Sequence, residues 1–344
     1  MTVGQAREAA REWMAEEASR IPGFRGAYTA GSTNWLPDDA DLPAGSDLDI
    51  MVLLADGSHA GGRRKFIYRG ALLEVSCLRS DQLELPEQIL GDYHLAPSFR
   101  TAKIIFDPSG RLTPLLAAVS RGYAKPRWVR RRCANADDKV LRNLQSIDKQ
   151  TPLHDQVMAC LFAAGVTTHV LLAAGLRNPT VRARYMAVRD LLGGYGHLEF
   201  HETLLHLLGS AHISRGRVER HVATLAEAFD AARGAIRTPF PFASDISDSA
   251  RPAAIDSSQE LIGRGYYREA MFWIGVTYSR CRKILSADAA GEMFDDAYQE
   301  LAGDLGLTTP AEVRLRSAEI RRTLPRIREL AESIIARNSE IDND

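Results

Sequence analysis

Cysteine is scarce in this chain, and the four that occur are widely separated: Cys77, Cys133, Cys160 and Cys281. No C-x-x-C pair is present, so the spacing indicates neither a zinc site nor a disulfide framework. We interpret the four cysteines as small buried hydrophobic residues of a protein kept under reducing conditions.

A surplus of positive charge is also missing. Lys and Arg number 43 against 44 Asp and Glu, which gives a net charge of −1. Proteins built mainly to bind phosphate backbones are usually strongly basic, so a nucleic-acid partner is not expected. One basic run, Arg127–Arg132 around Trp128, is interpreted as the solvated start of a helix at a domain boundary. A nucleic-acid patch is the less favoured alternative for this run.

Long apolar runs are missing as well. The first twenty residues include Arg7, Arg11 and several glutamates, which excludes the apolar core of a signal peptide. The most apolar internal run, Val157–Val166, is too short to span a bilayer. The sequence therefore predicts a soluble, cytoplasmic protein with no membrane partner.

What is present is a change of pattern along the chain. Up to about residue 124, short β-rich runs bounded by Gly, Pro, Asp or Ser alternate with helical stretches. The predicted strands are Arg25–Ala30, Leu48–Leu54, Ala71–Leu78 and Lys103–Phe106, and the predicted helices cover 3–20, 81–93 and 111–122. This pattern predicts an α+β domain with a small mixed sheet over residues 1–124.

From residue 125 onward the β signal nearly vanishes and helical apolar spacing takes over. Pro and Gly breakers separate the helical segments. The predicted helices cover 136–149, 153–174, 179–193, 197–209, 215–235, 257–285, 288–304 and 311–337. Residues 125–344 are therefore predicted to form an all-helical bundle domain, and 344 residues are enough for two separate cores.

The chemistry is concentrated in Gly31-Ser32 and, further along, Asp47-Leu48-Asp49. The period of two in a strand places Asp47 and Asp49 on one face, whereas Leu48 and the apolar residues after it suit a core. Two neighbouring carboxylates repel each other unless a cation or a proton lies between them. Magnesium prefers hard oxygen ligands, so the pair predicts a Mg²⁺ site. The Gly31-Ser32 turn would let backbone N–H groups and a hydroxyl approach phosphates.

A third carboxylate fits the same design. Glu74 is the single charge in the apolar run Leu72–Ser76, and a buried carboxylate without a partner would be costly. A neighbouring strand would bring Glu74 beside the Asp pair and complete a site for two metal ions. An exposed position on an edge strand is the alternative for Glu74.

These motifs resemble those of the DNA-polymerase-β-like nucleotidyltransferase superfamily. Its signature is Gly-Ser, a spacer, Asp-x-Asp on a strand and then a third acidic residue. Within it, the sequence looks most like the antibiotic adenylyltransferases of the streptomycin/spectinomycin and kanamycin kind, which add a helical C-terminal domain. The resemblance rests on three short pieces: Gly31-Ser32 with Ser46–Asp49, then Leu73–Ser76, then Thr277–Arg280.

The resemblance implies a role for each matching residue. Asp47, Asp49 and Glu74 would be the catalytic carboxylates that bind magnesium, with Glu74 acting as a metal ligand or as the catalytic base. The residues implied to bind the nucleotide are Gly31, Ser32, Ser46 and Arg280. Helical domains of the family supply carboxylates to the acceptor pocket, which makes Asp155 a candidate substrate-binding residue.

Two departures from the family concern spacing. The spacer from Ser32 to Asp47 is longer than is common, and the gap from Asp49 to Glu74 is shorter than in the streptomycin-type enzymes. Neither departure removes a carboxylate, but both leave the acceptor open.

The leading hypothesis is transfer of AMP from ATP to a hydroxyl of a small molecule, with two Mg²⁺ ions as cofactors and pyrophosphate as the second product. An antibiotic-like acceptor is included in that class. Two alternatives stay open: a nucleotidyltransferase that acts on a protein or an RNA end, and a non-catalytic nucleotide-binding regulator.

Overall fold

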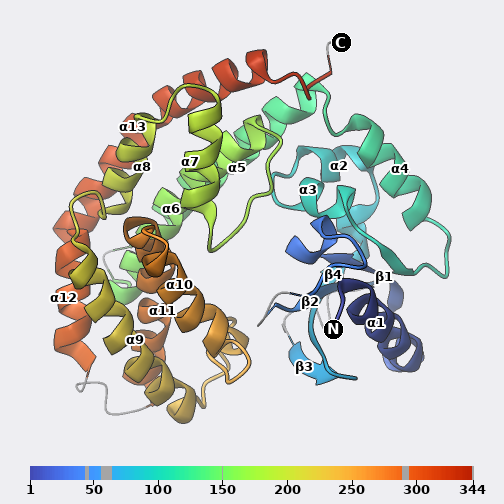
Figure 1. Cartoon of the computed structure of the whole chain (residues 1–344), viewed down its shortest axis with the longest axis horizontal. Helices are drawn as coiled ribbons and strands as arrows, with labels where there is room; N and C mark the ends of the chain where they lie inside the picture. The colour runs from blue at the N-terminus through green and yellow to red at the C-terminus, as the bar shows by residue number, and fades with distance from the viewer. Residues whose placement is uncertain (43–45, 56–63, 149, 289–293, 343–344) are drawn as a thin grey trace. The chain divides into compact units, whose positions relative to one another are not determined.

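The computed structural model describes residues 1–42, 46–55, 64–148, 150–288 and 294–342. The chain forms two compact units, Met1–Trp128 (with Asp342) and Val129–Ile341. The division falls inside helix α5 (Pro126–Gln145). The first unit contains the sheet and the second is helical (Figure 1), so the predicted α+β class is confirmed.

The sheet of the first unit has five strands in the order β3-β4-β2-β1-β5. Only the β2–β4 pair is parallel, whereas β1–β2, β1–β5 and β3–β4 are antiparallel, so the sheet is mixed. The strands are β1 (Phe24–Ala30), β2 (Leu48–Leu54), β3 (Arg64–Tyr68), β4 (Ala71–Arg79) and β5 (Ile104–Phe106). Sequence analysis predicted four of these strands and missed β3.

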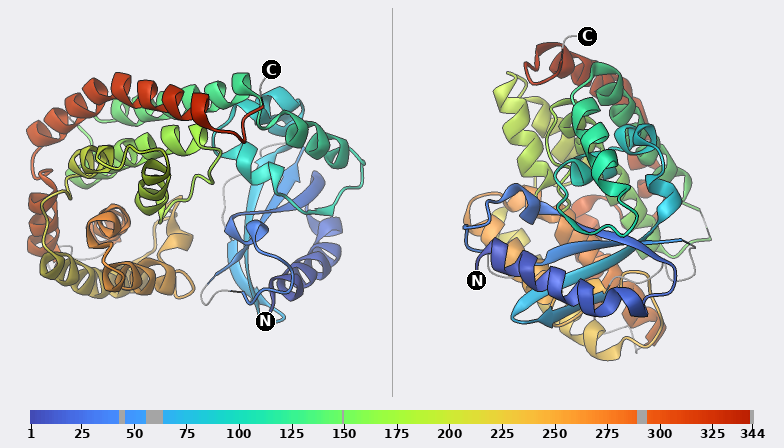
Figure 2. Two further views of the ribbon diagram at one scale, coloured as in Figure 1. Left: turned by 45° about the horizontal axis from the view of Figure 1, so that its top comes forward. Right: turned by 90° about the vertical axis from the view of Figure 1, so that its right-hand side faces the viewer.

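One face of the sheet is covered by helix α1 (Val3–Glu17), drawn in dark blue in Figure 2. A capping box opens this helix, since Thr2 accepts a hydrogen bond from the Gln5 backbone N–H and the Gln5 side chain accepts one from the Thr2 backbone N–H. Alternate residues of β2 and β4 point at α1 and are buried with it in a common core. That core includes Trp13, Met14, Leu48, Ile50, Val52, Leu73 and Val75.

Three helices follow the sheet strands in the first unit: α2 (Pro86–Gly91), α3 (Leu95–Arg100) and α4 (Leu112–Gly122). The predicted helix over 81–93 is therefore shorter than expected, because a 3₁₀ turn over Ser80–Leu83 precedes Pro86. Phe99 of α3 packs edge-on against Tyr28 of β1, with ring centroids 5.1 Å apart. These contacts cover the side of β1 that α1 leaves open.

The second unit is built around α6 (Leu153–Ala174), which is buried along most of its length. Its composition and length would allow it to cross a membrane, but 83% of that apolar window is buried inside the unit, as in the core helix of a globular protein. Helices α7 (Arg184–Gly194), α8 (Phe200–Leu208), α11 (Tyr267–Asp288) and α13 (Pro310–Arg337) pack against α6. The unit also contains α9 (Arg215–Ala235), α10 (Ser257–Gly263) and α12 (Asp295–Leu305).

Helix α5 and the α10–α11 segment also differ from the sequence prediction. The predicted helix over 257–285 is broken between α10 and α11, where Gly265 adopts a positive φ of 91° that favours glycine. Helix α5 begins at Pro126, so the basic run around Trp128 lies within its first turns. Trp128 and Arg132 are buried there, while Arg130 pairs with Glu332 of α13, so the run is not a uniformly solvated surface.

The interior of the helical unit contains a buried histidine. His201 of α8 is 2% exposed, and its Nε2 lies 3.2 Å from the Tyr185 carbonyl oxygen and 3.8 Å from Glu269 Oε1. Burial lowers the pKa of His201 to about 4, although the bond to Tyr185 opposes the change. Burial also raises the pKa of Glu269. The native unit therefore holds His201 neutral at pH values where an unfolded chain would protonate it.

We predict that this histidine makes the fold acid-sensitive. Between pH 6.5 and about 4 the unfolded state binds a proton at His201 and the native state does not, so stability falls as the pH falls. A pKa shift of this size lowers the free energy of unfolding by about 3 kcal/mol between the upper and lower ends of this pH range. Urea unfolding at pH 7 and pH 4.5 should show a smaller loss for His201→Gln than for the wild type. Glu269 acts in the opposite direction but is present in both proteins.

His206→Gln is the matched control, because His206 is an exposed histidine of the same helix. Its pH dependence should equal that of the wild type. Equal losses in all three proteins would contradict the role given to His201.

Candidate functional site

The candidate site is a row of side chains across the sheet, on the face opposite α1. The register pairs Asp49 of β2 with Glu74 of β4, and Glu74 with Lys65 of β3. Residues directly opposite each other in neighbouring strands point to the same face. Because Leu48 and Ile50 point into the α1 core, Asp49 and its partners point away from it.

Asp47 completes a triad with Asp49 and Glu74. It directly precedes β2, and one carboxylate oxygen from each of the three residues lies within 4.8 Å of the others. Glu74 is buried at 8% exposure, and the two aspartates are half-buried. The alternative of an exposed Glu74 is therefore wrong, and the three predicted carboxylates come together.

Lys65 contributes a positive charge to the same place. Its Nζ lies 2.5 Å from Asp47 Oδ2 and 2.9 Å from Glu74 Oε2, and its side chain is 10% exposed. Burial alone would raise the pKa of Asp47, but the interactions with Glu74 and Lys65 outweigh it and hold that pKa below its ordinary value. Burial alone would lower the pKa of Lys65, but the two carboxylates outweigh it and raise that pKa. The pair is therefore charged near neutral pH.

The donor set fits a magnesium ion. Three carboxylates offer hard oxygen ligands only, and magnesium keeps several waters or substrate oxygens in its remaining positions. With metal–oxygen distances of about 2.0–2.1 Å, two oxygens on one ion lie about 3–4 Å apart. The observed limit of 4.8 Å thus requires only a small closing movement to hold an ion.

The turn after β1 brings backbone up to this row. Gly31 follows Ala30, which pairs with Asp49, and adopts a φ of 76°. A Cβ added at Gly31 would lie 1.8 Å from Asp49 Oδ2, so only glycine allows this approach. A short 3₁₀ helix, Ser32–Trp35, follows. Its backbone is described, but the Ser32 side chain is outside the described part of the chain.

Two buried polar groups fix the turn in place. Asn34 donates from Nδ2 to the Thr29 carbonyl oxygen at 2.8 Å, and the Thr29 hydroxyl donates to Asn34 Oδ1 at 2.7 Å. Arg7 of α1, which is 4% exposed, donates from Nη2 to the Thr33 carbonyl oxygen at 2.8 Å and also pairs with Asp38. Sequence analysis missed Arg7 and Asn34, since neither belongs to a catalytic motif.

The long spacer is partly explained by contacts with the N-terminal segment. The Val3 N–H donates to the Ala40 carbonyl oxygen, and the Gly4 N–H donates to that of Asp38. Thr2 and Asp41 form an isolated β-bridge. The spacer thus passes the start of α1 on its way to β2. Residues 43–45 lie outside the described part, and Ser46, a predicted nucleotide ligand, is half-buried just before Asp47.

The two candidates of the helical unit have partners within that unit. Arg280 of α11 pairs with Asp245 at 3.0 Å, and its guanidinium carbon lies 5.3–6.0 Å from the ring centroids of Phe162, Phe242 and Trp273. Asp155 accepts two hydrogen bonds from Lys283 Nζ, at 2.8 and 2.9 Å. The nucleotide role of Arg280 and the acceptor role of Asp155 stay predictions.

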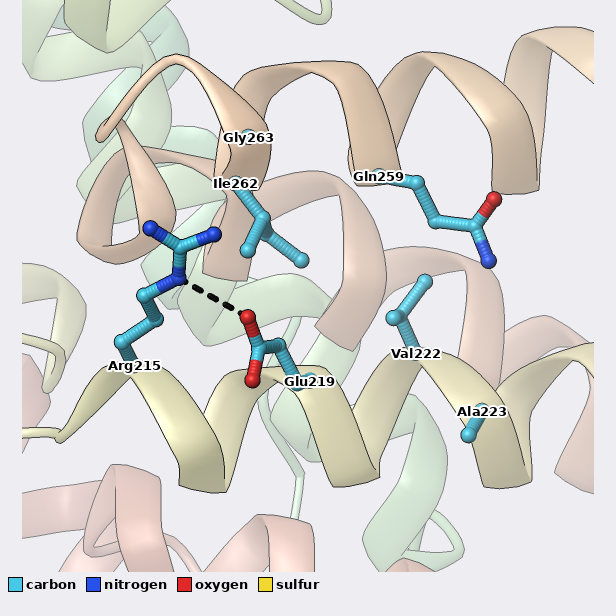
Figure 3. Close-up of a pocket in the computed structure, with 7 residues that line it drawn as sticks. All are labelled: Arg215, Glu219, Val222, Ala223, Gln259, Ile262 and Gly263. Carbon is cyan, nitrogen blue, oxygen red and sulfur yellow. Dashed lines mark hydrogen bonds and ion pairs between the residues drawn. The ribbon is translucent and has the colours of Figure 1, made fainter.

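Two pockets lie away from the triad. One, of about 250 Å³, lies between α9 and α10 and is lined by residues that include the Arg215–Glu219 pair, Val222 and Ile262 (Figure 3). The other, of about 360 Å³, lies in the first unit near Arg25, Leu53, Ser80 and Arg111. Leu53 and Ser80 mark the ends of β2 and β4 remote from Asp47. Neither lining includes Asp47, Asp49 or Glu74.

Comparison with known proteins gives little further guidance. No protein-family model matches the chain, and no curated protein matches it. Among solved structures, the chain is similar to a nucleotidyltransferase-like protein from Exiguobacterium sibiricum, with 13% sequence identity over 90% of this chain and 91% of the other. The TM-score of 0.33 is too low to establish a common fold.

We predict that Gly31→Ala disables cation binding. The added methyl group must displace the Asp49 carboxylate, and the Gly31 backbone (φ 76°, ψ −172°) lies in a region essentially restricted to glycine, which adds about 1–3 kcal/mol of strain. Mn²⁺ affinity, read by electron paramagnetic resonance, should fall at least about ten-fold for a displaced carboxylate ligand.

Gly110→Ala is the control that separates the effect of backbone strain from the effect of displacing the Asp49 carboxylate. Gly110 also has a positive φ, of 67°, but no atom lies within 4 Å of the Cβ it would gain. This variant should lose some stability in urea unfolding, because of its positive φ, and keep the wild-type Mn²⁺ affinity. Wild-type affinity in Gly31→Ala would show that the turn does not control Asp49.

Proposed function

We propose that this chain is a magnesium-dependent nucleotidyltransferase that transfers AMP from ATP to a hydroxyl group of a small molecule. The observation that carries the proposal is the triad of Asp47, Asp49 and Glu74 on one sheet face, with the Gly31 turn against it. An acidic cluster alone is common on protein surfaces. A cluster that is largely buried, and that demands glycine at the neighbouring turn, is typical of a site for a cation and a phosphate group.

Each residue has a proposed task. Asp47, Asp49 and Glu74 would hold the magnesium, for which the family resemblance implies two ions. When bound, magnesium would neutralise the negative charge that develops on the phosphate oxygens during the reaction. Backbone N–H groups after Gly31 bind the β- and γ-phosphates. The roles of Ser32, Ser46 and Arg280 at the nucleotide come from the family resemblance.

The proposed reaction is an in-line displacement at phosphorus. The acceptor oxygen forms a bond to the α-phosphorus while the bond from that phosphorus to the bridging oxygen of pyrophosphate breaks. The acceptor proton passes to a carboxylate, for which Glu74 is the candidate within the triad. A carboxylate of the helical domain, such as Asp155, is the alternative base or an acceptor-binding group.

We predict that Asp49→Asn removes nucleotidyl transfer and leaves the fold intact. A neutral amide cannot replace a charged ligand, and loss of charge stabilisation at a transition state typically lowers kcat by about 100- to 1,000-fold. Removing one of three neighbouring carboxylates also relieves repulsion, so the free energy of unfolding should not fall by more than about 1 kcal/mol. Pyrophosphate release and urea unfolding measure the two effects.

Glu87→Gln is the control for charge alone, since Glu87 is exposed on α2. Its turnover should match that of the wild type. Near-normal turnover of Asp49→Asn with magnesium present would show that Asp49 is not a required magnesium ligand.

The acceptor requires a separate experiment. Wild type and Asp49→Asn are each incubated with α-labelled ATP and with small-molecule extract, total protein or total RNA. Label transferred only by the wild type, and only to the small-molecule fraction, supports the proposal; a panel of aminoglycosides, lincosamides and cell metabolites read by mass then identifies the acceptor. Label in protein or RNA would favour the macromolecular alternative. Nucleotide binding without pyrophosphate release would favour a regulator.

A further inference from the structure

Lys65 is a residue that no family motif assigns. It lies on β3, the edge strand next to β4, and pairs in register with Glu74. Shifting the register by one residue would turn its side chain towards the α1 core. The strand register therefore places this ammonium group beside the triad, where it is largely buried.

The ammonium group and a bound cation would share carboxylates. Nζ contacts Asp47 Oδ2 and Glu74 Oε2, and these residues are two of the three that would hold a metal. An ammonium and a divalent ion repel each other strongly at a few ångströms in a partly buried site. Both cannot contact these oxygens at ligand distance.

Lys65 also offsets repulsion within the triad when no ion is bound. Its ammonium group contacts two carboxylates that would otherwise repel each other in a partly buried site. Lys65 thus stabilises the metal-free state and would be displaced in the metal-bound state.

We propose that Lys65 is an internal counter-ion that competes with the divalent cation for Asp47 and Glu74. This inference rests on the proposed metal site. Cation binding moves the Lys65 ammonium away from both carboxylates, and the competition weakens uptake of a free cation by the triad. Lys65 is thus a positioning residue that holds the ligands in place until a cation replaces it.

The first test measures Mn²⁺ affinity without nucleotide, by electron paramagnetic resonance, in the wild type and Lys65→Met. Removal of the competing charge should tighten Mn²⁺ binding by at least about ten-fold. Lys65→Met should also be less stable than the wild type in EDTA, with Mn²⁺ restoring most of the difference. A purely structural lysine would lower stability and leave Mn²⁺ affinity unchanged or weaker, which would overturn the proposal.

Arg111→Met is the matched control for overall charge. Arg111 is an exposed cation of the same unit that lies near Leu53 and Ser80, at the strand ends remote from Asp47. Its Mn²⁺ affinity should equal that of the wild type. An equal gain in both variants would assign the effect to net charge and overturn the specific role of Lys65.

A second test needs no variant and so does not depend on Lys65→Met folding. Lysine acylation by a small amine-reactive ester is read by peptide mass spectrometry in the wild type, in EDTA and with saturating Mn²⁺. Lys65 should react slowly in EDTA and at least about five-fold faster with Mn²⁺, because displacement exposes the amine. Unchanged reactivity while Mn²⁺ binds would show that the lysine stays in place.

The outcomes separate this inference from the proposed function. If Lys65→Met binds Mn²⁺ more tightly but the wild type transfers no nucleotide, the counter-ion proposal is supported and the proposed enzyme function is wrong. If the wild type transfers nucleotide but both proteins bind Mn²⁺ equally well, the counter-ion proposal is wrong and the proposed enzyme function stands. Absence of Mn²⁺ binding from both proteins overturns the counter-ion together with the metal site.

Discussion

The site depends on one electrostatic constraint: three carboxylates gathered on one sheet face repel each other unless a cation lies among them. The sheet meets this constraint with its own geometry. Parallel pairing of β2 with β4 places Asp49 beside Glu74, and the β3–β4 hairpin places Lys65 beside Glu74. The apolar residues between these positions point into the core with α1, so the same alternation that buries Leu48 and Ile50 also presents the charged row. One face of the sheet thus packs against α1, and the opposite face carries the charged residues of the site.

A second constraint acts on the turn that follows β1. Backbone that approaches a carboxylate this closely leaves no room for a side chain, and Gly31 is the residue that permits it. A glycine turn alone would be loosely held, since glycine gains most freedom on unfolding. The Thr29–Asn34 hydrogen bonds and the Arg7 side chain offset that freedom by binding the turn to β1 and to α1. The first helix therefore stabilises the site from both sides: through the core beneath the sheet and through Arg7.

Two signals in the sequence predicted that the three carboxylates come together. Asp47 lies two residues before Asp49, and Asp49 and Glu74 interrupt runs that otherwise suit buried strands. The period-two alternation of a strand then fixes their face. Strand β3 was missed because Arg64 and Lys65 open it and make it look like a polar connection. The sequence signal that could have revealed this strand is the turn residue Gly70 between Phe66-Ile67-Tyr68 and Ala71. In the structure, Arg69 and Gly70 both have a positive φ at this turn. Without β3 there is no strand to place Lys65. The contacts of Arg7 with Thr33 and Asp38 join residues remote in sequence, which no local pattern encodes.

Charged residues in apolar surroundings recur in the helical unit, and several of them have an opposite charge beside them. Asp155 pairs with Lys283, Asp137 with Arg328 and Arg280 with Asp245. A ligand that binds such a residue must replace a partner of equal and opposite charge, so a charged residue type by itself is weak evidence for a site. The triad differs in its geometry. The Lys65 ammonium group contacts Asp47 and Glu74 at once, and an oxygen of Asp49 lies within 4.8 Å of theirs. Carboxylate oxygens gathered from three residues offer the ligands that a divalent ion prefers, which the one-to-one pairs of the helical unit do not.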